Sequence, residues 1–351
     1  MKKYDCLSLF SGGLDSILAA KLLQAQGLKV LGLHCVSPFF GHEERIPYWQ
    51  QEYGLPIQPV DVGEEFVRML LSGPCWGVGK VLNPCVDCKI LMLGRARELL
   101  PRYGASFLAT GEVLGQRPMS QRRDTLNIIQ RDAGVKGLLL RPLCAGRLDP
   151  TPMEESGLVD RERLGSLSGR GRKGQLELAA AFGIRDVPTP AGGCLLTETE
   201  SSKRFWPVIA HLDAPRPDDF ELANVGRQLW REGHWLVVGR NKADNDSLLR
   251  LVRPSTDLVF RLKDFPGPIA VGRQTGRPWN GEIREQAAAA TASFSPKAVR
   301  AGATVTVRIA DRDGTEEITV QPRDPTTMGW HEPTWEEAEP EKKKRFGQVS
   351  D

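Results

Sequence analysis

The sequence lacks any apolar run long enough to cross a membrane, and it has little net charge. Its 351 residues are 40% hydrophobic and 26% charged, with a formal net charge of +3. No segment approaches the roughly 20 apolar residues of a transmembrane helix. So small a net charge does not by itself indicate a nucleic-acid partner, and any basic surface must be local. We therefore expect no membrane partner and a chain long enough for two domains.

A secretory signal and an even set of cysteines are also lacking. The apolar run after Met1–Cys6 ends at Phe10, which is too short for the hydrophobic region of a signal peptide. Seven cysteines, an odd number, argue against a secreted disulfide framework. These features predict a cytoplasmic protein, in which clustered cysteines indicate metal or redox chemistry.

The first 200 residues alternate between strand and helix patterns. Strands are predicted at 4–10, 28–36, 57–62 and 106–110, and helices at 14–25, 64–71, 90–100 and 175–182. This order predicts an α/β fold with a doubly wound, mostly parallel sheet. Residues 1–200 are therefore predicted to form one domain.

The remaining residues have a different pattern. A change of composition around 200–225 predicts a linker at 201–229. Residues 230–330 are expected to form a smaller, strand-rich α+β domain. Its strands are predicted at 235–238, 247–252, 258–262, 268–271, 305–309 and 317–320, with a helix at 283–292. The last segment, 331–351, is predicted to be a disordered charged tail.

A glycine-bearing turn joins the first predicted strand to the first helix. It reads Ser11-Gly12-Gly13-Leu14-Asp15-Ser16. Two glycines let the backbone approach an anion, and the amides of the following helix turn point at it. The turn lacks the lysine of a kinase-type nucleotide loop. The alternative is a simple turn in which Asp15 or Ser16 caps the helix.

This turn resembles the signature of the PP-loop ATP pyrophosphatases. The resemblance implies an adenine nucleotide alpha-hydrolase-like fold that cleaves ATP to AMP and pyrophosphate while adenylating a substrate oxygen. ATP and Mg²⁺ are the implied cofactors, and Asp15 is the implied catalytic residue of the loop. The predicted ATP-binding residues are Ser11, Gly12, Gly13, Leu14, Asp15, Ser16, His34 and Gly111.

Three cysteines lie in loops suited to chemistry. Cys85 and Cys88 form a C-x-x-C at the start of a predicted helix, where the helix dipole favours thiolate, and Cys194 follows two glycines. They could hold a four-iron cluster, work as a persulfide and disulfide pair (Cys88 and Cys194), form a zinc clip, or remain inert. The other cysteines are Cys6, Cys35 and Cys144, which we expect in the core, and Cys75, whose role stays open.

Three motifs resemble the tRNA thiouridylase branch of this family: Asn83–Cys88, Thr110–Gln121 and Ala191–Cys194. In the persulfide-type 2-thiouridylases, the position of Cys85 is usually an aspartate. Cys85 therefore moves the resemblance towards the cluster-dependent thiolases. It implies a [4Fe-4S] cluster held by Cys85, Cys88 and Cys194, with Cys88 and Cys194 also catalytic.

Basic residues suggest where RNA could bind. Segments 238–246 and 258–267 resemble the NFACT-type RNA-binding domain. The predicted RNA-binding residues are Arg117, Arg122, Arg123, Arg170, Arg172, Lys173, Arg240, Lys242, Arg261 and Lys263. The alternatives are solvated charged faces and a strand-rich interaction domain.

The combined prediction is an ATP-dependent tRNA-uridine sulfurtransferase. Its expected partners are tRNA and a sulfur donor: sulfide, a cysteine desulfurase or a sulfur carrier. Two other classes stay open. One is a PP-loop ligase acting on a small molecule, and the other is a non-catalytic RNA-binding factor.

Overall fold

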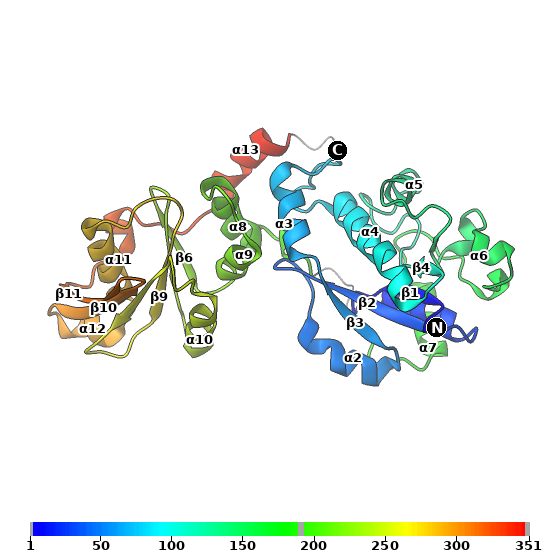
Figure 1. Cartoon of the computed structure of the whole chain (residues 1–351), viewed down its shortest axis with the longest axis horizontal. Helices are drawn as coiled ribbons and strands as arrows, with labels where there is room; N and C mark the ends of the chain where they lie inside the picture. Colours follow the sequence, from blue (N-terminus) through cyan, green and yellow to red (C-terminus); the bar gives the residue numbers. More distant parts are fainter. Residues whose placement is uncertain (1–2, 189–192, 348–351) are drawn as a thin grey trace. The chain divides into compact units, whose positions relative to one another are not determined.

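The computed structural model describes residues 3–188 and 193–347. Two compact units divide the chain after Thr197. Each unit has its own sheet, so each can be understood from its own strands and helices (Figure 1).

Unit 1 is an α/β unit around a parallel sheet of five strands in the order β3-β2-β1-β4-β5. The strands are β1 (Cys6–Leu9), β2 (Val30–Val36), β3 (Ile57–Asp61), β4 (Phe107–Ala109) and β5 (Leu139–Leu140). The α-helices are α1 (Leu14–Gln24), α2 (Ile46–Tyr53), α3 (Gly63–Ser72), α4 (Cys85–Tyr103), α5 (Arg123–Asp132), α6 (Pro152–Glu155) and α7 (Lys173–Ala181). Short 3-10 turns are η1 (Glu43–Arg45), η2 (Ala145–Arg147), η3 (Arg161–Arg163) and η4 (Leu195–Thr197).

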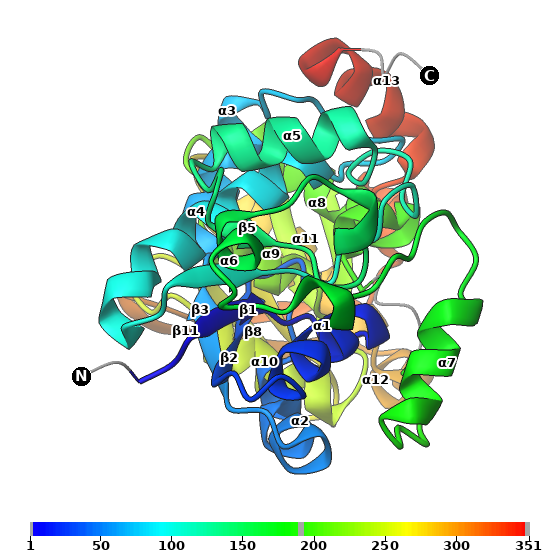
Figure 2. The ribbon, with the colours of Figure 1, turned by 90° about the vertical axis from the view of Figure 1, so that its right-hand side faces the viewer.

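Both faces of this sheet are covered by helices. Alternate strand residues point to opposite faces, so Cys6 joins the core under α1 and α2, whereas Leu7 joins the core under α4 and α5. Figures 1 and 2 show α4 and α5 on one face and α2 on the other. The predicted doubly wound, parallel fold is confirmed.

Unit 2 contains an antiparallel sheet of six strands in the order β11-β10-β8-β9-β7-β6. The strands are β6 (Arg227–Arg231), β7 (His234–Val238), β8 (Leu258–Leu262), β9 (Ile269–Arg273), β10 (Val305–Asp311) and β11 (Gly314–Val320). The helices are α8 (Thr199–His211), α9 (Pro217–Ala223), α10 (Lys242–Leu251), α11 (Gly281–Ser293), α12 (Pro296–Ala301) and α13 (Trp335–Phe346), with a 3-10 turn η5 (Pro325–Met328). The alanine-rich face of α11 packs into the core of the sheet.

Two sequence predictions about this unit are wrong. The expected strand at 247–252 falls in the end of helix α10, up to Leu251. Asn241 caps the start of this helix, and its side chain accepts a 2.9 Å hydrogen bond from the amide of Asp244. The expected linker at 201–229 contains α8, α9 and the first residues of β6. The polar residues of this segment lie on the outer faces of α8 and α9, and the inner faces of these helices bury Phe205 and Phe220.

The expected disordered tail is also wrong, because much of it forms α13. Thr334 and Glu337 make a capping box at its start. Trp206 of α8 donates a 2.7 Å hydrogen bond to Glu341, and its ring lies 6.2 Å from that of Phe346. Although charged, the segment buries the stem of Lys342, which is only 2% exposed. Packing against α8 therefore orders a helix that composition alone does not predict.

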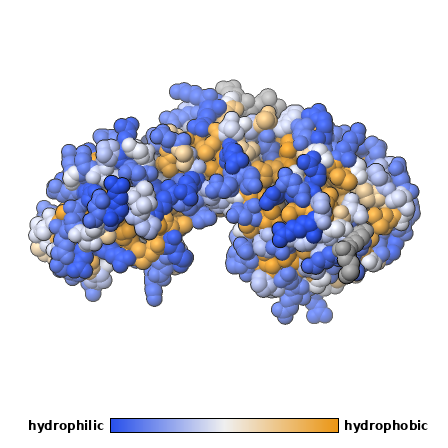
Figure 3. Space-filling view, viewed as in Figure 1, coloured by the Kyte–Doolittle hydropathy of each residue, from blue (hydrophilic) through white to orange (hydrophobic). Residues whose placement is uncertain are grey.

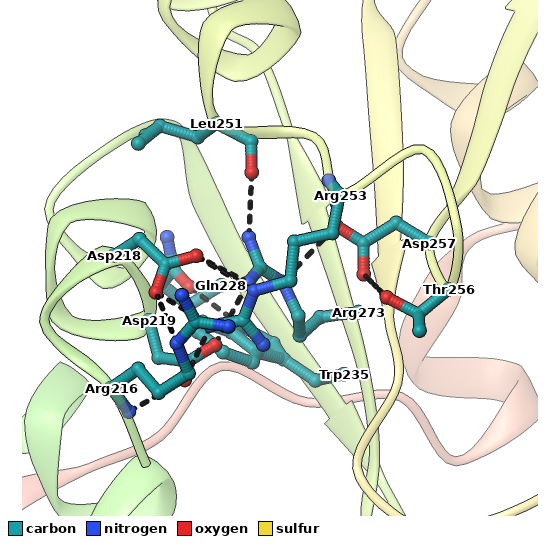
Figure 4. Close-up of polar contacts among 10 residues, drawn as sticks. All are labelled: Arg216, Asp218, Asp219, Gln228, Trp235, Leu251, Arg253, Thr256, Asp257 and Arg273. Atoms are coloured by element: carbon teal, nitrogen blue, oxygen red, sulfur yellow. Dashed lines mark hydrogen bonds and ion pairs between the residues drawn. The ribbon is translucent and has the colours of Figure 1, made fainter.

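A buried network of charges connects α9 to β9 and to the end of α10 (Figure 4). Arg273 is fully buried and donates hydrogen bonds to Asp219 at 2.9 Å and to the Leu251 carbonyl at 2.8 Å. Arg253 binds Asp218 through two nitrogens at 2.6 and 2.7 Å. The network therefore ties the segment before β6 to the sheet.

We expect Arg273→Ala to destabilise unit 2 by about 3–5 kcal/mol, because it leaves the buried carboxylate of Asp257 without its ion-pair partner and leaves Asp219 with Arg253 alone. Urea unfolding of the full chain, followed by a probe in unit 2, measures this loss. The matched control is Arg312→Ala, since the Arg312–Asp313 pair is exposed and should matter little. Equal effects of the two substitutions would show that the network does not stabilise the unit.

Within the described residues, no helix is both long enough and apolar enough to span a membrane. Figure 3 shows hydrophilic residues around the apolar patches on the visible face of each unit. The exposed large apolar side chains include Tyr48 and Trp76, at 44% and 42% exposure.

Candidate functional site

The turn between β1 and α1 is held in shape by its two serines. The Ser16 hydroxyl donates a 2.7 Å hydrogen bond to the Gly13 carbonyl, and it accepts one of 3.2 Å from the amide of Ser11. Gly12 has φ of 77°, a left-handed conformation that favours glycine. A Cβ at Gly12 would lie 2.8 Å or less from three atoms of the Trp49 ring on α2. The loop is therefore a fixed turn with its backbone pressed against Trp49.

We expect Gly12→Ala to weaken both the fold of unit 1 and its binding of ATP. The positive φ alone should cost about 1–2 kcal/mol, and the overlap with Trp49 adds to that cost. Gly54→Ala is the matched control, because Gly54 also has positive φ but has no atom within 4 Å of an added Cβ. Thermal unfolding and ATP titration of both variants test this. An equal loss of stability, with ATP affinity unchanged, would contradict a role for the Gly12 contact.

Gly111, at the end of β4, lies directly against this turn. An added Cβ there would be 2.5 Å from the carbonyl carbon and oxygen of Asp15 and 2.6 Å from the amide of Ser16. The carboxyl ends of β1 and β4 therefore meet at Asp15, as expected for neighbouring parallel strands. Burial raises the pKa of Asp15, and nearby amide and guanidinium groups offset only part of this rise. A nearby cation would restore the ionised form.

His34, predicted to bind ATP, already uses both ring nitrogens within the fold. Its Nδ1 lies 2.9 Å from the Phe10 carbonyl oxygen, and its Nε2 accepts a 2.9 Å hydrogen bond from the His42 amide. The ring is only 2% exposed and stacks edge-on with Trp49. Burial lowers its pKa, which favours the neutral ring. His34 therefore holds β2 to the loop that follows it, and no ring nitrogen remains for a ligand.

Cys85, Cys88 and Cys194 lie close to one another in unit 1. Cys85 begins α4, and its sulfur accepts a 3.1 Å hydrogen bond from the Asn83 side chain. Backbone hydrogen bonds tie the segment after Cys194 to the loop after β2 and to the loop before α4. The Leu195 amide donates to the Phe39 carbonyl at 2.9 Å, and the Leu82 amide donates to the Leu196 carbonyl at 3.0 Å. The motif residues Ala191 and Gly192 lie outside the described residues.

The environment of Cys88 differs from our expectation. We expected the start of the helix to lower the thiol pKa. Instead, burial raises the pKa of Cys88 well above its usual value, the neighbouring Cys194 and Cys85 raise it further, and Lys89 only partly opposes this. Desolvation therefore outweighs the helix dipole. The same interactions place the three thiols within electrostatic range of one another.

The remaining cysteines divide as predicted. Cys6, Cys35 and Cys144 are buried, which confirms them as core residues. Burial raises the pKa of Cys35 to about 12 and that of Cys144 to about 11. Cys75 is exposed, and its amide donates a 2.9 Å hydrogen bond to Asp87.

The three neighbouring thiols suit a metal cluster by their chemistry. Thiolates are the ligands of iron–sulfur clusters and of structural zinc. Across residues 3–188 and 193–347, however, no three cysteine, histidine or acidic side chains are already arranged as a metal site. The donor set fits a cluster, and binding one would require these side chains to adjust.

Lys89 and Glu112 connect the cysteines to the end of β4. Glu112 is 1% exposed and accepts hydrogen bonds of 3.0 Å from both Thr110 and Arg141. Burial opposes its ionisation, but Arg141 and Lys89 nevertheless hold the pKa of Glu112 below its usual value. Lys89 thus acts on Cys88 and on Glu112, which follows Gly111 directly. The cysteines and the glycine turn therefore share the carboxyl edge of the sheet.

The structure gives the predicted RNA-binding cations different surroundings. Arg117 and Arg172 lie close enough to Asp15 to lower its pKa, so they border the glycine turn. Five others have partners: Arg122 with Asp124, Arg123 with the Arg147 carbonyl, Lys173 with Glu177, Arg240 with Asp244, and Lys263 with Glu317. Arg170, Lys242 and Arg261 are exposed.

Sequence reasoning missed several residues at this edge. Trp49 packs on Gly12, and Gln116 and Gln175 lie beside Asp15. No sequence signal separates Trp49 from an ordinary core residue. Gln116 lies inside a motif that we singled out, so it could have been considered. Gln175 comes from a helix 160 positions after Asp15, and only the packing of α7 on α1 brings them together.

Residues 226–330 match the family described as NFACT protein RNA binding domain. The chain is 34% identical over 145 residues to a probable tRNA sulfurtransferase of Methanobrevibacter smithii, covering 38% of this chain and 36% of that protein. It is 32% identical over 125 residues to the tRNA-specific 2-thiouridylase MnmA of Syntrophotalea carbinolica, covering 31% and 35%. The chain thus spans about a third of the length of these curated relatives.

A solved structure, the U34-tRNA thiolase NcsA of Methanococcus maripaludis with its [4Fe-4S] cluster, overlaps 54% of this chain and 61% of its own, with a TM-score of 0.29 and 15% identity. At this TM-score, the two structures share only part of their backbone arrangement. The sequence matches are more specific. The chain is therefore similar, over part of its length, to tRNA-specific 2-thiouridylases and tRNA sulfurtransferases, and its residues 226–330 are similar to the NFACT protein RNA binding domain.

Proposed function

We propose that the protein is an ATP-dependent tRNA-uridine thiolase. One observation carries the proposal: the glycine turn and the three cysteines lie at the same carboxyl edge of one parallel sheet, linked through Gly111, Glu112 and Lys89. A turn of this kind binds phosphate, and neighbouring thiols handle sulfur. The sulfurtransferase relatives support the combination.

In the proposed reaction, a uracil carbonyl oxygen attacks the α-phosphorus of ATP and displaces pyrophosphate. The loop amides, with the hydroxyls of Ser11 and Ser16, would bind the phosphates, and Asp15 would hold Mg²⁺ on the leaving group. Sulfur then bonds to the ring carbon, the carbon–oxygen bond breaks, and AMP leaves. The acceptor oxygen must reach the turn from the side of the cysteines.

For the sulfur step we propose that Cys85, Cys88 and Cys194 hold a [4Fe-4S] cluster. When bound, a cluster held by these three thiolates would supply an iron able to bind sulfide. The alternative uses no cluster: Cys194 carries a persulfide, and Cys88 attacks it, forming a disulfide as sulfur passes to the ring. In either version, the hydrogen bond from the Asn83 side chain orients the sulfur of Cys85.

The two versions differ in what Cys85 does. In the cluster version, anaerobically purified protein is brown and contains iron and acid-labile sulfide, and Cys85→Ala loses both colour and thiolation. A colourless Cys85→Ala variant that still thiolates tRNA would establish the persulfide version. Iron content and thiolation are measured on the same preparation, so the two outcomes are separable.

Unit 2 is the proposed RNA-binding part. Arg261 of β8 lies directly opposite Arg308 of β10, and like charges in this position are unfavourable unless an anion lies between them. Arg308 and Lys263 share the single carboxylate of Glu317, at 2.8 and 2.6 Å. This part of the sheet therefore has an excess of positive charge that phosphates of tRNA would balance.

Nucleoside mass spectrometry of tRNA from a deletion strain tests the proposed function most broadly. We expect one thiouridine to disappear and to return on complementation. Unchanged thiouridines, with AMP formed from ATP and a small acceptor, would favour the small-molecule ligase. Unchanged thiouridines with no ATP cleavage would favour a non-catalytic RNA-binding factor. The proposed location is the cytoplasm, where tRNA is available.

A further inference from the structure

Two loops bring polar side chains close to Asp15. The first, residues 113–121, closes on itself through a 2.7 Å hydrogen bond from the Gly115 amide to the Gln121 carbonyl. The second leads into α7. A short bridge joins them, with the Gly169 amide donating to the Leu114 carbonyl at 2.8 Å. The bridge fixes the positions of Gln116 and Gln175 relative to α1.

Three buried polar atoms in this region have no hydrogen-bond partner among the described residues: Asp15 Oδ1, Gln116 Oε1 and Gln175 Nε2. Gln175 is only 1% exposed. Hydrogen bonding from both amide groups lowers the pKa of the Asp15 carboxyl, which places them beside it, yet Asp15 Oδ1 and Gln175 Nε2 have no partner with the distance and angle of a full hydrogen bond. Unsatisfied buried groups are rare because they cost stability, so three together indicate a missing ligand.

The types of these atoms indicate which ligand is missing. Two are acceptor oxygens, from Asp15 and Gln116, and hard oxygens are what Mg²⁺ prefers. The third is the Gln175 amide, a donor, and the guanidinium groups of Arg117 and Arg172 also lie near Asp15. The amide and the guanidinium groups can donate hydrogen bonds to an anion, while the two acceptor oxygens can bind a metal ion. Together they suit an oxygen-rich anion that carries Mg²⁺.

We infer that Gln116, Gln175, Arg117 and Arg172 form the binding site for the Mg²⁺-pyrophosphate leaving group. Gln175 and the two arginines donate to its oxygens, while Asp15 and Gln116 face the magnesium ion. The inference rests on the proposed ATP cleavage and assigns residues to one half of that site. It also assigns Arg117 and Arg172 to the nucleotide and not to RNA.

A purely structural role for Gln175 predicts a different outcome. A buried glutamine that stabilises the fold has hydrogen-bond partners for its amide. Gln228 is an example, because its Nε2 donates to the Leu222 carbonyl at 3.2 Å and its Oε1 accepts from Trp235 at 2.8 Å. Removing such an amide lowers stability. The buried amide of Gln175 without a partner instead costs the folded protein its desolvation free energy. Removing this amide removes that cost, so the ligand-free protein should become more stable.

The test compares Gln175→Leu with Gln228→Leu in the full chain. Calorimetric titration with Mg²⁺ and inorganic pyrophosphate gives the affinity, and thermal unfolding without ligand gives the stability. For Gln175→Leu we expect pyrophosphate binding to weaken about tenfold or more, with an unchanged or higher melting temperature. For Gln228→Leu we expect unchanged binding and a lower melting temperature.

Each outcome is decisive. Pyrophosphate affinity of Gln175→Leu equal to that of the wild type would overturn the inference while leaving the proposed function intact. A lower melting temperature with unchanged affinity would assign Gln175 to the fold alone. If the wild type itself does not bind Mg²⁺ and pyrophosphate, the proposed ATP site fails as well. Arg172→Ala, whose side chain is not in the core, gives a second measure in which weaker pyrophosphate binding is expected.

Discussion

Replacement of Cys194 by alanine should abolish thiouridine formation while AMP and pyrophosphate still form. Cys194 is a neighbour of Cys88 and is not one of the proposed phosphate or Mg²⁺ ligands, so those ligands stay in place in the variant. We expect thiolation to fall below detection and the initial rate of adenylation to change by no more than about twofold. Release of labelled pyrophosphate and nucleoside analysis of the same tRNA measure the two steps separately.

The control is Cys75→Ala, because Cys75 is the exposed cysteine outside this group of three. It should retain both steps. If Cys194→Ala and Cys75→Ala thiolate equally well, Cys194 does not carry or bind sulfur. If Cys194→Ala instead loses adenylation, its loop acts on the nucleotide and the division of work between the cysteines and the turn is wrong.

Asp15→Asn should reduce ATP cleavage at least about 100-fold, because the neutral amide loses the charge that attracts Mg²⁺ to the leaving group. The substitution preserves the shape of the side chain. It also keeps an oxygen that could cap α1, so it separates metal binding from the capping alternative raised by the sequence. Pyrophosphate release in the presence of tRNA measures the effect.

The matched control is Asp61→Asn, at the end of the neighbouring strand β3. Asp61 accepts a 2.8 Å hydrogen bond from the Gly63 amide, which its amide counterpart can still accept. This variant should cleave ATP at the normal rate. An Asp15→Asn enzyme with full activity would show that the carboxylate only shapes the turn.

Local patterns predicted four of the five strands of unit 1 and its fold class, but not its helices α2 and α5. The apolar runs of β1, β2 and β3 and the glycine turn before α1 are short-range signals, and their alternation with helices specifies a doubly wound sheet. In unit 2, most strands were predicted as well. The segment 247–252 was misread because Leu248, Leu249 and Leu251 look like a strand when the Asn241 cap is overlooked.

Long-range packing explains what the sequence could not reveal. Arg273 lies more than 50 positions after Asp218 and Asp219, and nothing in their local patterns predicts a buried charge network. Likewise, α13 is ordered by contacts with Trp206, far away in the chain. The predictions of a linker and a disordered tail therefore rested on the polar surface residues of these segments and overlooked the residues that they bury.

The candidate site shows the same division. Spacing and turn chemistry identified the residues near Asp15 and Cys88, because these motifs act through local backbone geometry. His34 was predicted to bind ATP, but its ring nitrogens serve the fold. The unpaired amide of Gln175 became visible only from burial and hydrogen bonding, which no sequence pattern encodes.

The most direct test of the central claim is the stoichiometry of a single reaction. The full chain, purified without oxygen, is incubated with labelled ATP, unmodified tRNA and sulfide, and AMP and thiouridine are quantified together. If the glycine turn and the three cysteines serve one reaction, one AMP appears for each thiouridine formed, and omission of tRNA suppresses both. Formation of ADP, or of thiouridine without AMP, would contradict this account.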